Sequence, residues 1–226
     1  MGENRTILGI NKFEKSLILV ICTILGAIIG WYLPVIADWV LKLPIIPMEQ
    51  WVRFISSLDH FWVSVIAAAV GIIAGLIFSL VVFHESLTVT VSDHQLELVL
   101  GDEVKTFKRE DIYAVYMENK NLVVLGQDSQ ELYREVLEAK LDTVRQAFYL
   151  HGYPWMDEDP FADHYQRWVE GHPDFPPPVN ALMRARERAL KEDKKTAKYL
   201  REELAELGVV IRDERNGQFA RKGGMD

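Results

Sequence analysis

The chain has 226 residues, a net charge of −8 and one cysteine. That length suits one sizeable domain or two small ones. The single thiol, Cys22, excludes an intramolecular disulfide and a zinc site built on several cysteines. Charge is divided unevenly, because residues 1–83 are neutral, residues 84–181 carry −11 and residues 182–222 carry +4. We therefore expect an acidic middle followed by a basic tail.

Two long uncharged runs lie near the N-terminus, at residues 17–37 and 61–83. At about 1.5 Å per residue, each is long enough to cross the ~30 Å hydrocarbon core of a bilayer. A signal peptide would have a shorter apolar run and a small-residue cleavage site. The first run instead ends in Trp31, Tyr32 and Pro34. The pattern predicts two transmembrane helices, and the lack of ionisable residues favours an anchor over a transporter.

The basic residues around these runs predict their orientation. Arg5, Lys12 and Lys15 precede the first run, and this excess favours a cytoplasmic N-terminus. Two spans then return the C-terminal portion to the cytoplasm. Residues 38–60 would lie outside, either as an amphipathic helix along the membrane surface from about Met48 or as a packed turn.

Small residues recur at a spacing of four in both runs. Gly26 and Gly30 lie in the first, and Gly71 and Gly75 lie in the second. Such stripes let helix backbones approach closely in lipid. Two alternatives follow: the two spans pack on each other, or a stripe joins two copies of the chain in a homodimer.

Residues 84–156 change from continuous apolar to alternating character. The alternation predicts strands at 86–91, 96–100, 104–107, 112–118 and 122–125. Apolar residues at helical spacing then predict a helix from 131 through 150. Several short antiparallel strands closed by one helix indicate a small β-barrel-like module.

This order of elements resembles that of pleckstrin-homology-like (PH-like) domains, and with two preceding spans it is similar to the membrane-tethered bacterial versions. The segment 147–155, AFYLHGYPW, resembles the YqeB-like family of bacterial membrane proteins. The resemblance implies two spans, a PH-like domain and a helical tail. It implies no known activity.

Histidines and acidic residues gather after this module. Side chains able to bind a divalent metal occur at His151, Asp157, Glu158, Asp159, Asp163 and His164. Their spacing matches no recognised metal motif, and Asp159 with Pro160 is typical of a helix start. The chain also has no Gly-x-Ser-x-Gly, glycine-rich phosphate loop or His-Glu-x-x-His. We therefore expect that the protein binds no metal or cofactor and that it is not an enzyme.

The basic tail follows a proline-rich segment. Residues 171–178 include three consecutive prolines, which predict a stiff extended linker. Helices are then predicted at 181–190 and 196–207. Gly208 ends the second helix, and a hairpin follows within 209–221.

Residues 197–213, AKYLREELAELGVVIRD, resemble the C-terminal anticodon-binding segment of cysteinyl-tRNA synthetases. The resemblance implies RNA contacts by Arg201 and Asp213. Lys194, Lys198 and Arg221 add positive charge that can contact phosphates, which contributes affinity without sequence information.

Departures from that family favour a different role. Lys194 and Lys198 stand where the synthetases have a tryptophan and an aspartate, and Ala189 stands where they have an arginine. Acidic residues also alternate with basic ones at three- or four-residue spacing, as in a solvated helix laced with ion pairs. A basic stretch can equally rest on the anionic inner leaflet.

The predicted fold class is an α+β membrane protein with two transmembrane helices, a small antiparallel PH-like domain closed by a helix, and a C-terminal helical module with a short hairpin. The expected parts are a transmembrane hairpin at 1–83, the PH-like domain at 84–156, a connector at 157–178 and the basic module at 179–222. We expect a non-enzymatic adaptor that binds a protein partner at the bacterial cell membrane. The alternative is a membrane-tethered RNA-binding protein, directed to tRNA.

Overall fold

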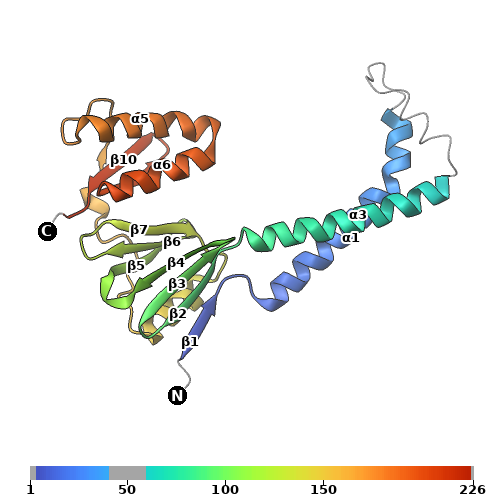
Figure 1. Ribbon diagram of the computed structural model, residues 1–226, viewed down its shortest axis with the longest axis horizontal. Coiled ribbons are helices and arrows are strands. Elements are labelled where there is room, and N and C mark those ends of the chain that lie inside the picture. Colours follow the sequence, from blue (N-terminus) through green and yellow to red (C-terminus); the bar gives the residue numbers. More distant parts are fainter. Residues whose placement is uncertain (1–3, 41–59, 225–226) are drawn as a thin grey trace. The chain divides into compact units, whose positions relative to one another are not determined.

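The computed structural model describes residues 4–40 and 60–224 (Figure 1). The chain divides into two compact units. One comprises residues 10–86 with 100–102 and is a helical hairpin. The other comprises the remaining residues and holds all the strands.

The helical hairpin consists of α1 (Lys12–Val40) and α3 (His60–His84). Both helices are long and apolar enough to span a membrane, and only 6% and 11% of their most apolar stretches are buried. Apolar surface exposed on this scale would be unfavourable in water and is favourable in lipid. The helix predicted from Met48 lies outside the described residues.

The two helices cross where glycines bring their backbones together. A Cβ atom added at Gly26 would collide with the Gly71 carbonyl oxygen, and one added at Gly71 would collide with the Gly26 carbonyl oxygen. Gly30 and Gly75 approach the opposite helix in the same way. These four residues therefore pack α1 against α3 within one chain.

The β-domain, which we define as β1 to β7 with α4, contains two antiparallel sheets. The first sheet has the order β1 (Arg5–Leu8), β2 (Thr88–Ser92), β3 (Gln95–Leu100) and β4 (Glu103–Lys108). The second has the order β5 (Ile112–Glu118), β6 (Asn121–Gly126) and β7 (Glu131–Val136). Helix α4 (Leu141–Leu150) follows. The predicted strands are confirmed within two residues at their boundaries.

The core of the β-domain follows the alternation seen in the sequence. Leu96 and Leu98 of β3 are buried, whereas the residue between them is only partly so. Phe148 of α4 is fully buried, with ring centroids 5.5 Å from Tyr153 and 5.8 Å from Trp155. The aromatic segment after α4 thus belongs to this core.

The helix predicted from 131 through 150 is only half correct. Residues Glu131–Val136 form strand β7, which pairs antiparallel with β6, and the helix begins at Leu141. Pairing with β6 across the short turn at 127–130 decided the conformation, which the apolar spacing within 131–136 does not report.

Residues Arg5–Leu8 also differ from the sequence-based division. They form β1, whose register pairs Thr6 with Val91 and Leu8 with Val89. The N-terminus therefore belongs to the β-domain, and the chain enters the helical hairpin only after Gly9.

The tail module, which we define as β8 to β10, is a sheet with two helices. Its elements are β8 (Gln166–Arg167), α5 (Pro177–Glu192), α6 (Lys194–Glu206), β9 (Val209–Glu214) and β10 (Gly217–Lys222). The strand order is β8–β10–β9. A buried cluster that includes Met183, Leu204 and Ile211 fills the space between helices and sheet. Both predicted helices and the hairpin are confirmed.

The predicted stiff linker is wrong. Phe175 is buried in the core of the tail module, and Pro177 and Pro178 occupy the first turn of α5. Proline suits this position because the first helical N–H groups have no intrahelical partner. Trp168 also joins the core and donates from Nε1 to Asn180 Oδ1 at 2.9 Å. Much of the connector is thus part of the folded module.

We predict that Gly26→Leu destabilises the helical hairpin by about 1–3 kcal/mol, since the side chain must occupy space already filled by backbone. Thermal unfolding of the full chain in detergent, followed by circular dichroism, measures the effect. Ala69→Leu adds a similar side chain at an exposed position and should leave the transition unchanged. Equal transitions for the two variants would contradict this packing.

Candidate functional site

The carboxylate of Asp213 on β9 collects three guanidinium hydrogen bonds. Arg186 on α5 donates from Nη1 and Nη2 to the two carboxylate oxygens, each at 2.7 Å. Arg201 on α6 donates from Nη2 to Asp213 Oδ2 at 2.9 Å. One carboxylate therefore ties both helices to the sheet of the tail module.

Arg186 is buried, with only 3% of its side chain exposed. It lies three residues after Met183 and seven after Val179, so helical geometry places it on the apolar face of α5. Its Nη1 also donates to Gln218 Oε1 at 2.5 Å, and Gln218 Nε2 donates to the Met183 carbonyl oxygen at 3.1 Å. A buried cation needs this degree of pairing.

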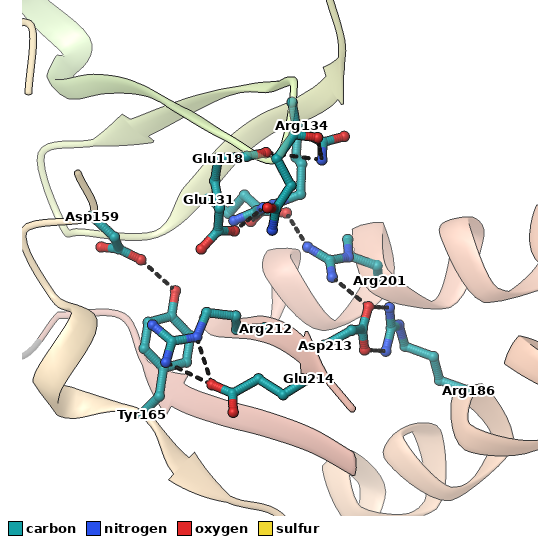
Figure 2. Close-up of polar contacts among 12 residues, drawn as sticks. Glu118, Glu131, Arg134, Asp159, Tyr165, Arg186, Arg201, Arg212, Asp213 and Glu214 are labelled. Carbon is teal, nitrogen blue, oxygen red and sulfur yellow. Dashed lines mark hydrogen bonds and ion pairs between the residues drawn. The ribbon is translucent and has the colours of Figure 1, made fainter. Parts of the chain in front are cut away.

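A second group of charges lies on the β-domain. Arg134 on β7 donates to Glu118 at 2.6 Å and to Glu131 at 2.7 Å. Glu131 has only 4% of its side chain exposed and also accepts from Arg201 Nη1 at 3.4 Å. Arg201 therefore links the two groups (Figure 2). The resulting ionic network runs through Glu118, Arg134, Glu131, Arg201, Asp213 and Arg186.

The network favours the charged forms of its members. Burial acts to raise the pKa of Asp213, but hydrogen bonds from Arg186 and the charges of Arg186 and Arg201 outweigh it, so that pKa is lowered. Burial acts to lower the pKa of Arg134, but the charge of Glu131 outweighs it and that pKa is raised. Both groups are therefore ionised at neutral pH.

The structure brings several predicted RNA-binding residues together, although in different settings. Arg201 and Asp213 bind each other within the ionic network. Lys198 forms an ion pair with Glu135 of β7. Lys194 is exposed and forms no ion pair with the residues that the structure describes.

Arg221 lies apart from these residues. It is 2% exposed, and its guanidinium carbon sits 4.5 Å from the ring centroid of Phe161 and 5.4 Å from that of Tyr165. Contacts of this kind stabilise a buried cation. Tyr165 in turn donates to Asp159 at 3.0 Å, and burial of its phenol raises its pKa to about 12. Arg221 thus packs inside the fold.

Sequence reasoning missed Arg186, Arg134 and the two glutamates that bind Arg134. The position of Arg186 on the apolar stripe of α5 was a readable signal. Of the glutamates, Glu131 lies only three residues before Arg134, whereas Glu118 lies 16 residues before it and only the fold joins that pair.

Several of the residues considered as metal ligands have other partners. His151 is buried between Asp93, 2.6 Å from Nδ1, and Thr6, 2.9 Å from Nε2. It thereby fastens β1 to the rest of the β-domain. Asp159 accepts from the Phe161 backbone N–H at 2.9 Å. No three histidine, cysteine, aspartate or glutamate side chains converge within 4–40 and 60–224.

The fold defines a class of protein in which an apolar helical hairpin is joined to a β-domain and to a small module of two helices and a sheet. In this chain the ionic network links the last two parts. The chain matches the model of the YqeB-like bacterial PH domain over residues 6–156, and it belongs to this family. Residues 172–221 match the cysteinyl-tRNA ligase anticodon-binding domain.

One relative is similar in sequence to this chain over almost its full length. The "Uncharacterized protein YqeB" of Bacillus subtilis (strain 168) is 39% identical over 223 residues, which cover 98% of this chain and 93% of the relative. No solved structure matches this chain.

We predict that Asp213→Ala destabilises the protein by about 2 kcal/mol, because it leaves the buried Arg186 charge unpaired. The loss stays below that of a fully buried pair, since the Asp213 side chain is 38% exposed. Urea unfolding followed by tryptophan fluorescence measures it. Glu214→Ala removes the neighbouring surface pair with Arg212 and should cost less than about 1 kcal/mol. A smaller loss for Asp213→Ala than for Glu214→Ala would refute the central role of Asp213.

The lowered pKa of Asp213 predicts a dependence of stability on pH. A carboxyl group whose pKa is lower in the folded state contributes stability above its unfolded pKa of about 3.9, and this stability is lost as the pH falls further. The free-energy difference between the wild type and Asp213→Asn should therefore shrink below about pH 4. Urea titrations at several pH values measure the difference, and a constant difference down to acid unfolding would contradict the assignment.

Proposed function

We propose that this protein is a non-enzymatic adaptor, anchored in the bacterial cell membrane, that offers its β-domain and tail module to a protein partner in the cytoplasm. One observation carries the proposal. The residues that the synthetase resemblance assigns to RNA contact, Arg201 and Asp213, already bind each other. Both oxygens of the Asp213 carboxylate accept from guanidinium groups, which leaves little capacity for a base edge.

The helical hairpin supports the membrane anchor. Its exposed surface is almost wholly apolar, and both helices have the length of a bilayer crossing. Lys12 and Lys15 at the start of α1 favour a cytoplasmic N-terminus. An even number of spans then places the tail module on the same side.

The glycines favour one hairpin per chain over a homodimer formed through the same stripe. Gly26, Gly30, Gly71 and Gly75 all face the partner helix of their own chain. A second copy would have to use other residues of α1 and α3, so the adaptor does not require self-association through these positions.

The second candidate function is RNA binding at the membrane. It is supported by the match of residues 172–221 to an anticodon-binding domain. Lys194, Lys195 and Lys198 are exposed on α6 and can contact phosphates. Arg221 is buried against Phe161 and Tyr165 and does not add to that surface. Such binding would be electrostatic and weakly selective for sequence.

A photo-crosslinking amino acid separates the two functions. It is placed at Tyr199 on α6 in cells that make the full chain, and at Tyr149 on α4 as a control, since both residues are 59% exposed. We predict discrete adducts at position 199 that survive ribonuclease and disappear with protease. The control position should give different adducts or none.

Adducts at position 199 that ribonuclease removes would favour the RNA function. The same broad, unresolved set of adducts at both positions would indicate non-specific crosslinking and would contradict a specific partner at α6.

A further inference from the structure

A pocket of about 360 Å³ lies between the β-domain and the tail module. The β5–β6 hairpin and β7 form one wall, and α5, α6 and β9 form the other. Its charged lining includes Arg134, Arg186, Lys194, Lys198 and Arg201. Its volume falls at the small end of the range for sites that hold small molecules.

The lining carries more positive than negative charge. Its carboxylates are Glu118, Glu135 and Asp213, against the five cations. Each of these carboxylates is already bound to at least one cation. Even when the buried Glu131 is included, the cations exceed the carboxylates by one. The pocket therefore suits an anion.

Two buried guanidinium groups in the lining have donors to spare. Arg134 Nη2 and Arg186 Nε are inaccessible to solvent and have no hydrogen-bond acceptor among the described residues. Their side chains are 9% and 3% exposed. Buried donors of this kind are normally satisfied. A ligand with several acceptor oxygens would supply the missing acceptors once these two side chains turn toward the pocket.

Lys194 and the apolar lining narrow the class of ligand. Lys194 stands at the pocket with no ion pair among the described residues, so its charge is free for an anion. Leu190 and Ala197 add apolar surface to the same pocket. Cations with apolar surface beside them match a phosphate joined to an organic group.

We propose that this pocket binds a small phosphate ester of about mononucleotide size. The phosphate takes hydrogen bonds from the arginines and from Lys194, while the organic part lies on Leu190 and Ala197. Because the pocket has walls from both modules, its ligand holds the tail module on the β-domain. The site does not depend on which macromolecule the tail module binds.

The test is calorimetric titration of the full chain in detergent with adenosine monophosphate, and separately with inorganic phosphate. We expect saturable binding of the nucleotide with one molecule per chain. Lys194→Glu should weaken it about tenfold through loss of a charge-assisted hydrogen bond. Lys195→Glu makes the same change at an exposed neighbour outside the lining and should have little effect.

A gain in affinity provides a second check that misfolding cannot imitate. Glu135 competes for Lys198 through their ion pair. Glu135→Gln should therefore tighten nucleotide binding severalfold, because it frees the lysine for phosphate.

Several results would overturn the proposal. They are the absence of saturable nucleotide binding at millimolar concentration, equal weakening by Lys194→Glu and Lys195→Glu, and binding of inorganic phosphate alone. A short single-stranded RNA that binds where the mononucleotide does not would replace the small ligand with a nucleic acid.

Discussion

Arg186 places a permanent positive charge within the apolar core of the tail module, and Asp213 is the carboxylate that neutralises it. Burial of an arginine is unfavourable unless its geometry and partners are well matched. The bidentate hydrogen bonds from Arg186 to Asp213, each at 2.7 Å, provide this match and set the position of α5 against β9. Gln218 then fixes β10 relative to the same guanidinium. Packing of the helices on this sheet follows from these constraints.

The Asp213 carboxylate also determines which basic side chains of the tail module remain available to bind a partner. Asp213 also accepts from Arg201, whose other terminal nitrogen reaches Glu131 of the β-domain. A basic side chain that could serve RNA thus contributes to the fold, and Arg221 does so through Phe161 and Tyr165. Residues 172–221 match an anticodon-binding domain, yet in this structure Arg201 and Asp213 bind each other and Arg221 packs inside the fold.

The regular elements could be read from the sequence where the signal is local. The two apolar runs, the alternation around Leu96 and Leu98, and the two tail helices all appear at the predicted places. Strand β1 could not be read in this way, since it depends on pairing with a segment that only the folded chain brings near. Strand β7 pairs with the preceding strand β6, and it was missed because the apolar residues after Glu131 also fit a helical spacing. The prolines of the supposed linker start α5 because proline also suits the first helical turn.

Only part of the candidate site could be predicted from the sequence, because several of its contacts join residues far apart in the chain. Arg201 and Asp213 were found through a resemblance, but their mutual hydrogen bond requires α6 and β9 to lie together. Glu131 comes from another module and is separated from Arg201 by 70 residues. No spacing rule connects residues so far apart, whereas the helical position of Arg186 could have been noticed.

The most direct test of this account is a double-mutant cycle on Glu131→Gln and Arg201→Gln, with unfolding free energies of the full chain measured in urea. The account predicts that the two losses are not additive and that the coupling favours the paired residues by about 0.5 kcal/mol or more. Additive losses would mean that the two side chains do not interact. The ionic network would then end at Arg201, which still donates to Asp213, and it would not join the tail module to the β-domain.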